Sequence, residues 1–189
     1  MRDFEIRAAL HQRLDRRYGE AENVRIVDEM GVLAGSCRID IAVINGRLEG
    51  FEIKSERDDL KRLDRQASAY GLVFDRLTVV CAERHLEKAV ASLPEWWGVE
   101  VAEACGESIA IVRWRQPRAN PDLDLSAVAQ LLWREEALTA LERCGQAKGL
   151  RSKPRKVLWQ ALTETLSANA LRALVREQLR QRQGWPAGA

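Results

Sequence analysis

The sequence predicts an α/β fold in which a mixed central β-sheet is flanked by helices and followed by a C-terminal helical module. Two observations support this prediction. Short apolar runs of strand length alternate with segments of helical period up to about residue 116, which is typical of a sheet with helices on its faces. Beyond that point the periodic segments are helical. We therefore divide the 189 residues into a core, a linker, a helical module and a tail, at residues 1–116, 117–124, 125–183 and 184–189.

The first half of the core begins with an amphipathic helix and continues with three strands. Apolar residues at helical spacing predict the helix over residues 3–17, and its apolar face is expected to cover the sheet. Asn45-Gly46 is a strong signal for a tight hairpin between the second and third strands. The three strands are predicted at residues 24–30, 38–44 and 50–55.

The second half of the core alternates helices and strands before it ends in two strands. Because a helix that joins two strands of one sheet usually makes them parallel, this succession indicates a mixed sheet with helices on its faces. Helices are predicted at residues 57–74 and 83–93, and strands at residues 77–82, 99–102 and 108–114.

The C-terminal module is separated from the core by a proline-containing linker. Pro117 and Pro121, with polar neighbours, cannot continue a strand. Ser167 is expected to cap the last helix. Helices are predicted at residues 131–143, 157–166 and 168–181, and a basic loop at residues 145–154 joins the first two.

Composition limits the classes of protein that this sequence can belong to. No apolar run approaches the length of a membrane span and the N-terminus has no apolar signal region, so we expect a soluble, cytoplasmic protein. Four scattered cysteines and two histidines indicate neither a zinc site nor a disulfide framework, and buried thiols are expected. The net charge of +2 argues neither for nor against nucleic acid as a partner. Of the 30 basic residues 24 are Arg, which suits phosphate contacts, although a GC-rich genome gives the same bias.

The most informative residues are Asp40, Glu52 and Lys54, on adjacent apolar strands joined by the hairpin. Alternate side chains of a strand share a face, so Glu52 and Lys54 point one way, and the hairpin could bring Asp40 to the same face. Mg²⁺ takes oxygen ligands and usually only one or two carboxylates, a demand that Asp40 and Glu52 meet and to which the carbonyl of Ile53 could add. Lys54 would orient the attacking water or stabilise an oxyanion.

A solvated sheet face with cross-strand ion pairs is the alternative interpretation of these residues. Against it, Asp40 interrupts a run of apolar residues that otherwise predicts a buried strand, where an unpaired carboxylate is costly. Glu29, at the end of the first strand, could be an outer carboxylate or a surface charge.

The order of helix, strand, Asp-bearing strand, Glu-x-Lys strand, helix and strand resembles the core of the PD-(D/E)xK nuclease superfamily, over about residues 3–101. The resemblance implies a restriction-endonuclease-like core, metal binding by Asp40 and Glu52, and Lys54 as the catalytic lysine. In the superfamily the first helix often contributes an acidic residue, for which Glu5 is the candidate. RecB-like members also carry Gln-x-x-x-Tyr on the following helix, which Gln66 and Tyr70 match. No Pro precedes Asp40, which departs from the pattern. Residues 39–54, 60–63 and 94–98 resemble more closely a small bacterial and prophage family labelled nuclease-like.

The helical module weakly resembles a SAP-type DNA-binding hairpin over about thirty-five residues. Its basic residues would form a compact phosphate-binding patch, and a solvated loop beside a packed bundle is the equally weighted alternative. The predicted contacts are Lys148, Arg151, Lys153, Arg155 and Lys156.

Together these patterns predict metal-dependent hydrolysis of phosphodiester bonds in nucleic acid, with DNA favoured over RNA and Mg²⁺ as the cofactor, for which Mn²⁺ could substitute. The alternative is a non-catalytic nucleic-acid-binding or accessory protein on the same fold. A homodimer or a protein partner stays open. The strandedness of the substrate, endo or exo cleavage, and a role in repair or defence stay open as well.

Overall fold

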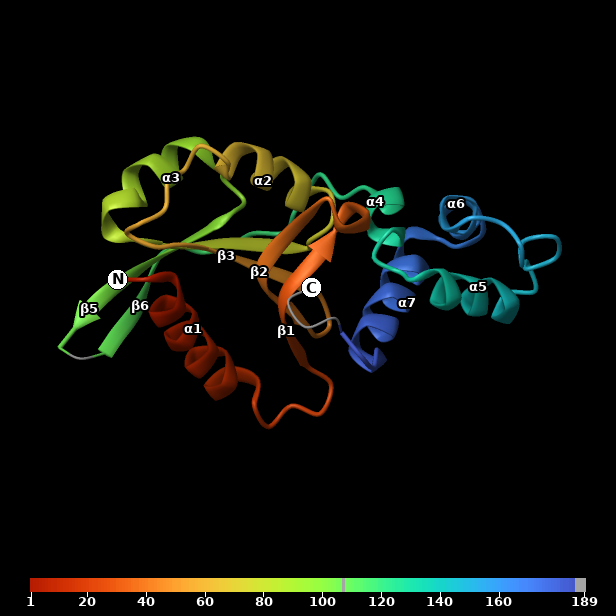
Figure 1. Cartoon of the computed structure of the whole chain (residues 1–189), viewed down its shortest axis with the longest axis horizontal. Coiled ribbons are helices and arrows are strands. Elements are labelled where there is room, and N and C mark those ends of the chain that lie inside the picture. The colour runs from red at the N-terminus through yellow and green to blue at the C-terminus, as the bar shows by residue number, and fades with distance from the viewer. Residues whose placement is uncertain (107, 186–189) are drawn as a thin grey trace.

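The computed structural model describes residues 1–106 and 108–185 and has a six-stranded mixed sheet at its centre (Figure 1). The strands lie in sequence order. β3 pairs in parallel with β4 and β4 with β5, whereas the outer pairs are antiparallel. The predicted fold class is confirmed. The strands are β1 (Arg25–Val32), β2 (Cys37–Ile44), β3 (Leu48–Lys54), β4 (Arg76–Ala82), β5 (Gly98–Cys105) and β6 (Ser108–Arg115).

Helices cover both faces of the sheet (Figure 1). On one face α1 (Asp3–Tyr18) buries Ile6, Leu10 and Leu14, whose spacing of four places them on one stripe of the helix. On the other face lie α2 (Leu63–Gly71) and α3 (Leu86–Ser92). Short 3-10 helices, η1 (Leu33–Gly35) and η2 (Glu83–His85), follow β1 and β4. The centre of the sheet is therefore covered on both faces, and β3 is buried along its whole length, whereas the edge strand β6 is partly exposed.

The C-terminal helices pack at one end of the long axis of the molecule (Figure 1). They share one continuous cluster of buried residues with the α2 face of the sheet. Residues 117–124 join the two parts without a helix or strand, yet Asn120 donates to the carbonyls of Gly71 and Phe74 at 2.6 and 2.7 Å. The predicted division of the chain into domains stays a prediction. The helices are α4 (Leu125–Ala129), α5 (Arg134–Arg143), α6 (Arg155–Thr165) and α7 (Ala168–Gln181).

Two predicted helices were too long. The helix expected from residue 57 begins at Leu63, because the N–H and hydroxyl of Ser55 both donate to Asp58 Oδ2, at 2.7 and 2.6 Å, and fix a turn instead. The helix expected from residue 131 begins at Arg134, because Trp133 is extended and its N–H donates to Glu136 Oε2 at 2.7 Å, as at a helix start.

The cysteines and the C-terminal tail differ from the predictions in what the structure describes. Buried thiols were predicted, but Cys105 and Cys144 are exposed, since Cys105 is the last residue of β5 and Cys144 directly follows α5. Of the predicted tail, residues 186–189 lie outside the described part of the chain. Within the described residues, none of the helices has the length and apolar character needed to cross a membrane.

Candidate functional site

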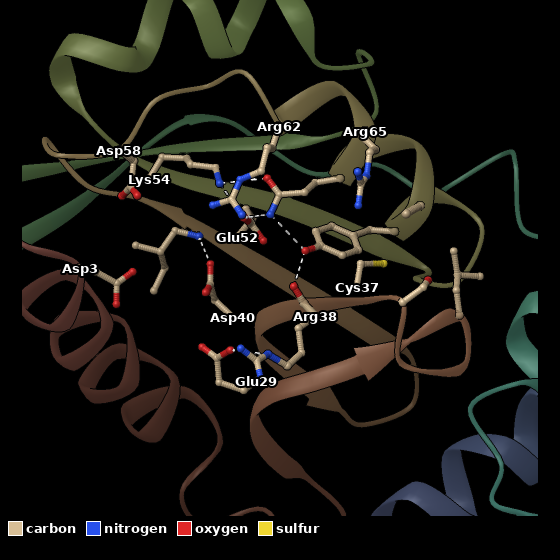
Figure 2. Close-up of a pocket in the computed structure, with 16 residues that line it drawn as sticks. Asp3, Glu29, Cys37, Arg38, Asp40, Glu52, Lys54, Asp58, Arg62 and Arg65 are labelled. Carbon is tan, nitrogen blue, oxygen red and sulfur yellow. Dashed lines mark hydrogen bonds and ion pairs between the residues drawn. The ribbon is translucent and has the colours of Figure 1, made fainter. Parts of the chain in front are cut away.

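A pocket of about 510 Å³ opens where β2 and β3 part (Figure 2). The two strands pair from Ile44 and Leu48 as far as Ile41 and Phe51. Beyond that point a side chain replaces the main-chain pairing: Asp40 Oδ2 accepts a hydrogen bond from the N–H of Ile53 at 2.6 Å. Five carboxylates and four cationic side chains line the pocket: Asp3, Glu29, Asp40, Glu52 and Asp58, with Arg38, Lys54, Arg62 and Arg65.

Glu52 and Lys54 enter the pocket from β3, on the face that the alternation of the strand predicts. Lys54 Nζ lies 2.7 Å from Glu52 Oε1, and the two side chains are only 5% and 3% exposed. Gln66, from α2, closes the group: its Nε2 donates to Glu52 Oε1 at 2.5 Å, and its Oε1 accepts from Lys54 at 3.0 Å. The other oxygen of this carboxylate, Glu52 Oε2, is buried and has no hydrogen-bond partner within the described residues.

The electrostatics of the two carboxylates are coupled through the pocket. Burial raises the pKa of the Glu52 carboxyl to about 7, and the charge of Asp40 adds to the rise while Lys54 opposes it. Burial also raises the pKa of Asp40, against the hydrogen bond from Ile53 and the charge of Arg7. Because ionised Glu52 and Asp40 destabilise one another, a cation between them would be favoured electrostatically.

Arg7, from α1, already supplies part of that positive charge. Its Nη2 lies 2.9 Å from both Asp40 Oδ1 and Glu29 Oε1, and its Nη1 donates to the main-chain carbonyl of Asp40 at 2.8 Å. The sequence interpretation missed this residue. A signal was present, since residues 3, 7, 10 and 14 follow helical spacing and put Arg7 on the stripe that faces the sheet.

Glu29 lines the pocket, and its backbone is unusual for a strand residue. Its φ of 53° interrupts the pairing of β1 with β2 between Asp28 and Met30. A non-glycine residue in this region costs about 1–3 kcal/mol. The conformation is associated with ion pairs from the Glu29 carboxylate to Arg7 at 2.9 Å and to Arg38 at 3.0 Å.

The expected placement of Glu5 was wrong. Its carboxylate accepts a hydrogen bond from the N–H of Arg2 at 2.5 Å, at the start of α1, and it does not line the pocket. Asp3 does line it. The physical reason is helical geometry, because residues two apart point to nearly opposite sides of a helix.

The pocket-facing side of α2 carries a polar stripe. Gln66 and Tyr70 lie on it as predicted, and Gln66 Nε2 is 3.3 Å from the Tyr70 hydroxyl, which in turn donates to the carbonyl of Arg38. Arg62 and Arg65 continue the stripe toward solvent and were not predicted, although their spacing from Gln66 and Ala69 gives the same helical face. Both are exposed, and neither guanidinium forms a hydrogen bond or ion pair within the described residues.

The basic residues predicted to bind nucleic acid lie elsewhere. Lys148, Arg151, Lys153, Arg155 and Lys156 are all exposed, on and just after the loop between α5 and α6 at the far end of the molecule (Figure 1). Arg151 pairs with Glu142 at 2.9 Å. None of the five lines the carboxylate pocket. Their role in binding stays a prediction.

Fold and pocket together define a mixed-sheet α/β protein with a buried carboxylate and lysine group at a parting of two strands. Residues 1–185 match the family described as Bacteriophage P4 protein cII, and the chain belongs to that family. Protein cII of Enterobacteria phage P4 is 28% identical over 182 residues, which cover 96% of this chain and 68% of that protein. A solved protein of unknown function from Silicibacter pomeroyi aligns with a TM-score of 0.46 at 19% identity, over 82% of this chain and 98% of its own. The chain is therefore phage-related.

Proposed function

We propose that this protein hydrolyses phosphodiester bonds in nucleic acid, with DNA favoured, in a reaction that depends on a divalent metal ion. The observation that carries the proposal is the Glu52 carboxylate, which is buried beside Lys54 and Asp40 and keeps one oxygen without a hydrogen-bond partner among the described residues. Burying a carboxylate is expensive unless it is paired, hydrogen-bonded or bound to a metal. A group of this kind in a pocket is a candidate for function.

The residues present fit Mg²⁺ or Mn²⁺. Asp40 and Glu52 would hold the ion, which matches the one or two carboxylates that Mg²⁺ usually takes. The carbonyl of Ile53 could add an oxygen, because it points to the same side of the strand as the N–H that binds Asp40. Within the described residues no group of three or more His, Cys, Asp or Glu side chains is arranged to hold a metal. When bound, the ion would make water more acidic and neutralise charge on the phosphate.

The protein's own side chains supply the remaining functions. Lys54, fixed by Glu52 and Gln66, is placed to orient the attacking water or to stabilise negative charge that develops on the phosphate. Arg62 and Arg65 project from α2 at the rim and can bind neighbouring phosphates. Tyr70 fixes Gln66 and the Arg38 carbonyl, so it is a positioning residue.

A second candidate is a non-catalytic nucleic-acid-binding or accessory protein. The observation that favours it is Arg7, whose guanidinium already neutralises Asp40 and Glu29. In a protein that had lost its metal, Arg7 could neutralise these carboxylates in place of the ion.

One experiment distinguishes the nuclease from the accessory protein. The purified protein is incubated with labelled linear, circular and single-stranded DNA, in Mg²⁺, Mn²⁺ or EDTA. The nuclease proposal expects fragments that EDTA suppresses and that the Asp40→Asn variant does not produce. Glu5→Gln is the matched control, because it removes an acidic group outside the pocket. DNA binding in EDTA, without fragments under any metal condition, would favour the accessory protein.

A further inference from the structure

A second cleft, of about 370 Å³, lies between the β1–β2 connection and the C-terminal helices. We call it the Trp–Arg cleft, after Trp133, Arg134, Arg155, Arg182 and Trp185, which line it. The described lining residues include no carboxylate. Its lining is therefore aromatic and carries three arginines, of which Arg182 pairs with Glu136 and Arg134 with Glu135, whereas Arg155 has no ion pair among the described residues.

The Trp133 ring packs against the Arg182 guanidinium and remains 43% exposed. The guanidinium of Arg182 lies 4.3 Å from the centre of its ring and 4.6 Å from that of Trp185. Arg182 is itself fixed by Glu136 Oε1 at 2.7 Å and by the Leu131 carbonyl at 2.8 Å. An indole that is fixed in place and partly open to solvent is a suitable surface for stacking a nucleobase.

Polar groups beside the ring suit a phosphate or a base edge. Arg155 is exposed, and its guanidinium rests 5.2 Å above the Trp159 ring. Arg134 also lines the cleft. The indole N–H of Trp185 is buried and has no hydrogen-bond partner among the described residues. The combination of a planar apolar surface, donors and positive charge matches a nucleotide better than an apolar peptide.

One turn separates the cleft from the carboxylate pocket. Leu33 and Ser36 line the pocket, whereas Ala34 and Gly35 line the cleft. Leu33 and Ala34 have φ values of 50° and 58°, so the chain bends sharply between the two sites. A nucleic-acid strand with a phosphate in the pocket can reach the cleft by crossing this turn. An unpaired base has a free face for Trp133, whereas a paired base inside a duplex is stacked on both faces.

We infer that the Trp–Arg cleft binds a base and phosphate of single-stranded nucleic acid, next to the carboxylate pocket. The path from cleft to pocket rests on the proposed function, whereas binding in the cleft does not. The substrate class would then be a strand, or a strand end, that is single-stranded near the cleaved bond.

The test is fluorescence anisotropy of the full chain with a labelled single-stranded oligonucleotide and with a blunt duplex, in EDTA. Trp133→Ala should weaken binding of the single strand by about 5- to 150-fold, and Trp133→Phe should restore most of it. Binding of the duplex should be unchanged. Trp114→Ala is the matched control, because Trp114 is 63% exposed but lies on β6, away from the cleft.

Arg155→Ala keeps the inference testable if Trp133→Ala does not fold. It should weaken single-strand binding and lower the magnitude of the salt slope by about 0.7. Unchanged single-strand affinity in Arg155→Ala and in folded Trp133→Ala would overturn the inference, as would a wild-type protein that binds no single strand. Single-strand binding that depends on Trp133, in a protein that cleaves nothing, would support the cleft while refuting the proposed nuclease function.

Discussion

The carboxylate pocket and the basic residues 148–156, which run from the α5–α6 loop into α6, are both clusters of charge in the sequence, but they differ in burial in the structure. In the pocket, Glu52 and Lys54 are at most 5% exposed and bond to each other and to Gln66. On the loop, Arg151 is 79% exposed, and its partner Glu142 is 40% exposed. Exposed pairs contribute little to stability, whereas a buried charge is costly without compensation. Buried charges are therefore the stronger indication of function.

The largest expected effect is at the pocket itself. Asp40→Asn removes the charge of a proposed metal ligand but keeps an oxygen that can accept from the Ile53 N–H. Initial rates of DNA cleavage should fall by about 10²–10³-fold or more, the scale of losing one electrostatic contact to the transition state. Melting followed by circular dichroism should show that the variant is folded. A loss below tenfold in the folded variant would mean that Asp40 has no part in the reaction.

The second prediction concerns pH and stability. Because the pKa of Glu52 rises from 4.5 to about 7 on folding, the folded state binds the proton more tightly, and stability should fall as pH rises between these values. From pH 5 to pH 8 this residue should remove about 2 kcal/mol from the free energy of unfolding. Urea denaturation at pH 5 and at pH 8 measures this change in the free energy of unfolding.

Glu52→Gln should lose this pH-dependent decline, because glutamine does not titrate. Glu5→Gln, at an exposed carboxylate, is the control and should retain it. An equal decline in wild type and Glu52→Gln would assign the effect to another group.

A smaller effect is expected at Arg7. Its guanidinium and a divalent cation both require Asp40, so Arg7→Gln should bind Mn²⁺ several-fold more tightly than wild type, as measured by isothermal titration calorimetry. Arg13→Gln is the control, because Arg13 also lies on α1 but its guanidinium bonds to Glu100 of β5, outside the pocket. Weaker Mn²⁺ binding in Arg7→Gln would show instead that Arg7 orients Asp40 for the metal.

The smallest effect is expected at the basic loop. If the loop contacts phosphates, charge reversal at Lys153 and Lys156 should lower DNA affinity without regard to sequence and reduce the magnitude of the salt slope by about one per lost contact. Reversal at Arg16 and Lys88, which are exposed elsewhere, gives the same change in charge as a control. Equal losses in the two double variants would mean that only net charge matters.

Much of the fold was predictable because periodicity is local. The hairpin at Asn45, the amphipathic helix α1 and the cap at Ser167 all follow from residues close together in sequence. The alternation of β3 also placed Glu52 and Lys54 on one face. These features required no knowledge of distant contacts.

The missed residues depend on tertiary placement. Nothing local in the sequence distinguishes Arg7 and Arg65 from other helical arginines before α1 and α2 are packed beside the parted strands. Glu5 was likewise chosen without knowledge of which side of α1 meets the pocket. The start of α2 was missed because a side chain, Asp58, competes with the helix for backbone N–H groups. This competition is local, since Ser55 and Asp58 are only three residues apart, so the sequence contained the signal for it.

The central claim is that Asp40 and Glu52 hold a divalent cation, and anomalous scattering from crystals grown with Mn²⁺ tests it most directly. The account predicts one Mn²⁺ peak within bonding distance of Asp40 and of Glu52 Oε2, absent from Asp40→Asn crystals. A pocket without Mn²⁺, in which Arg7 still pairs with Asp40, would contradict it.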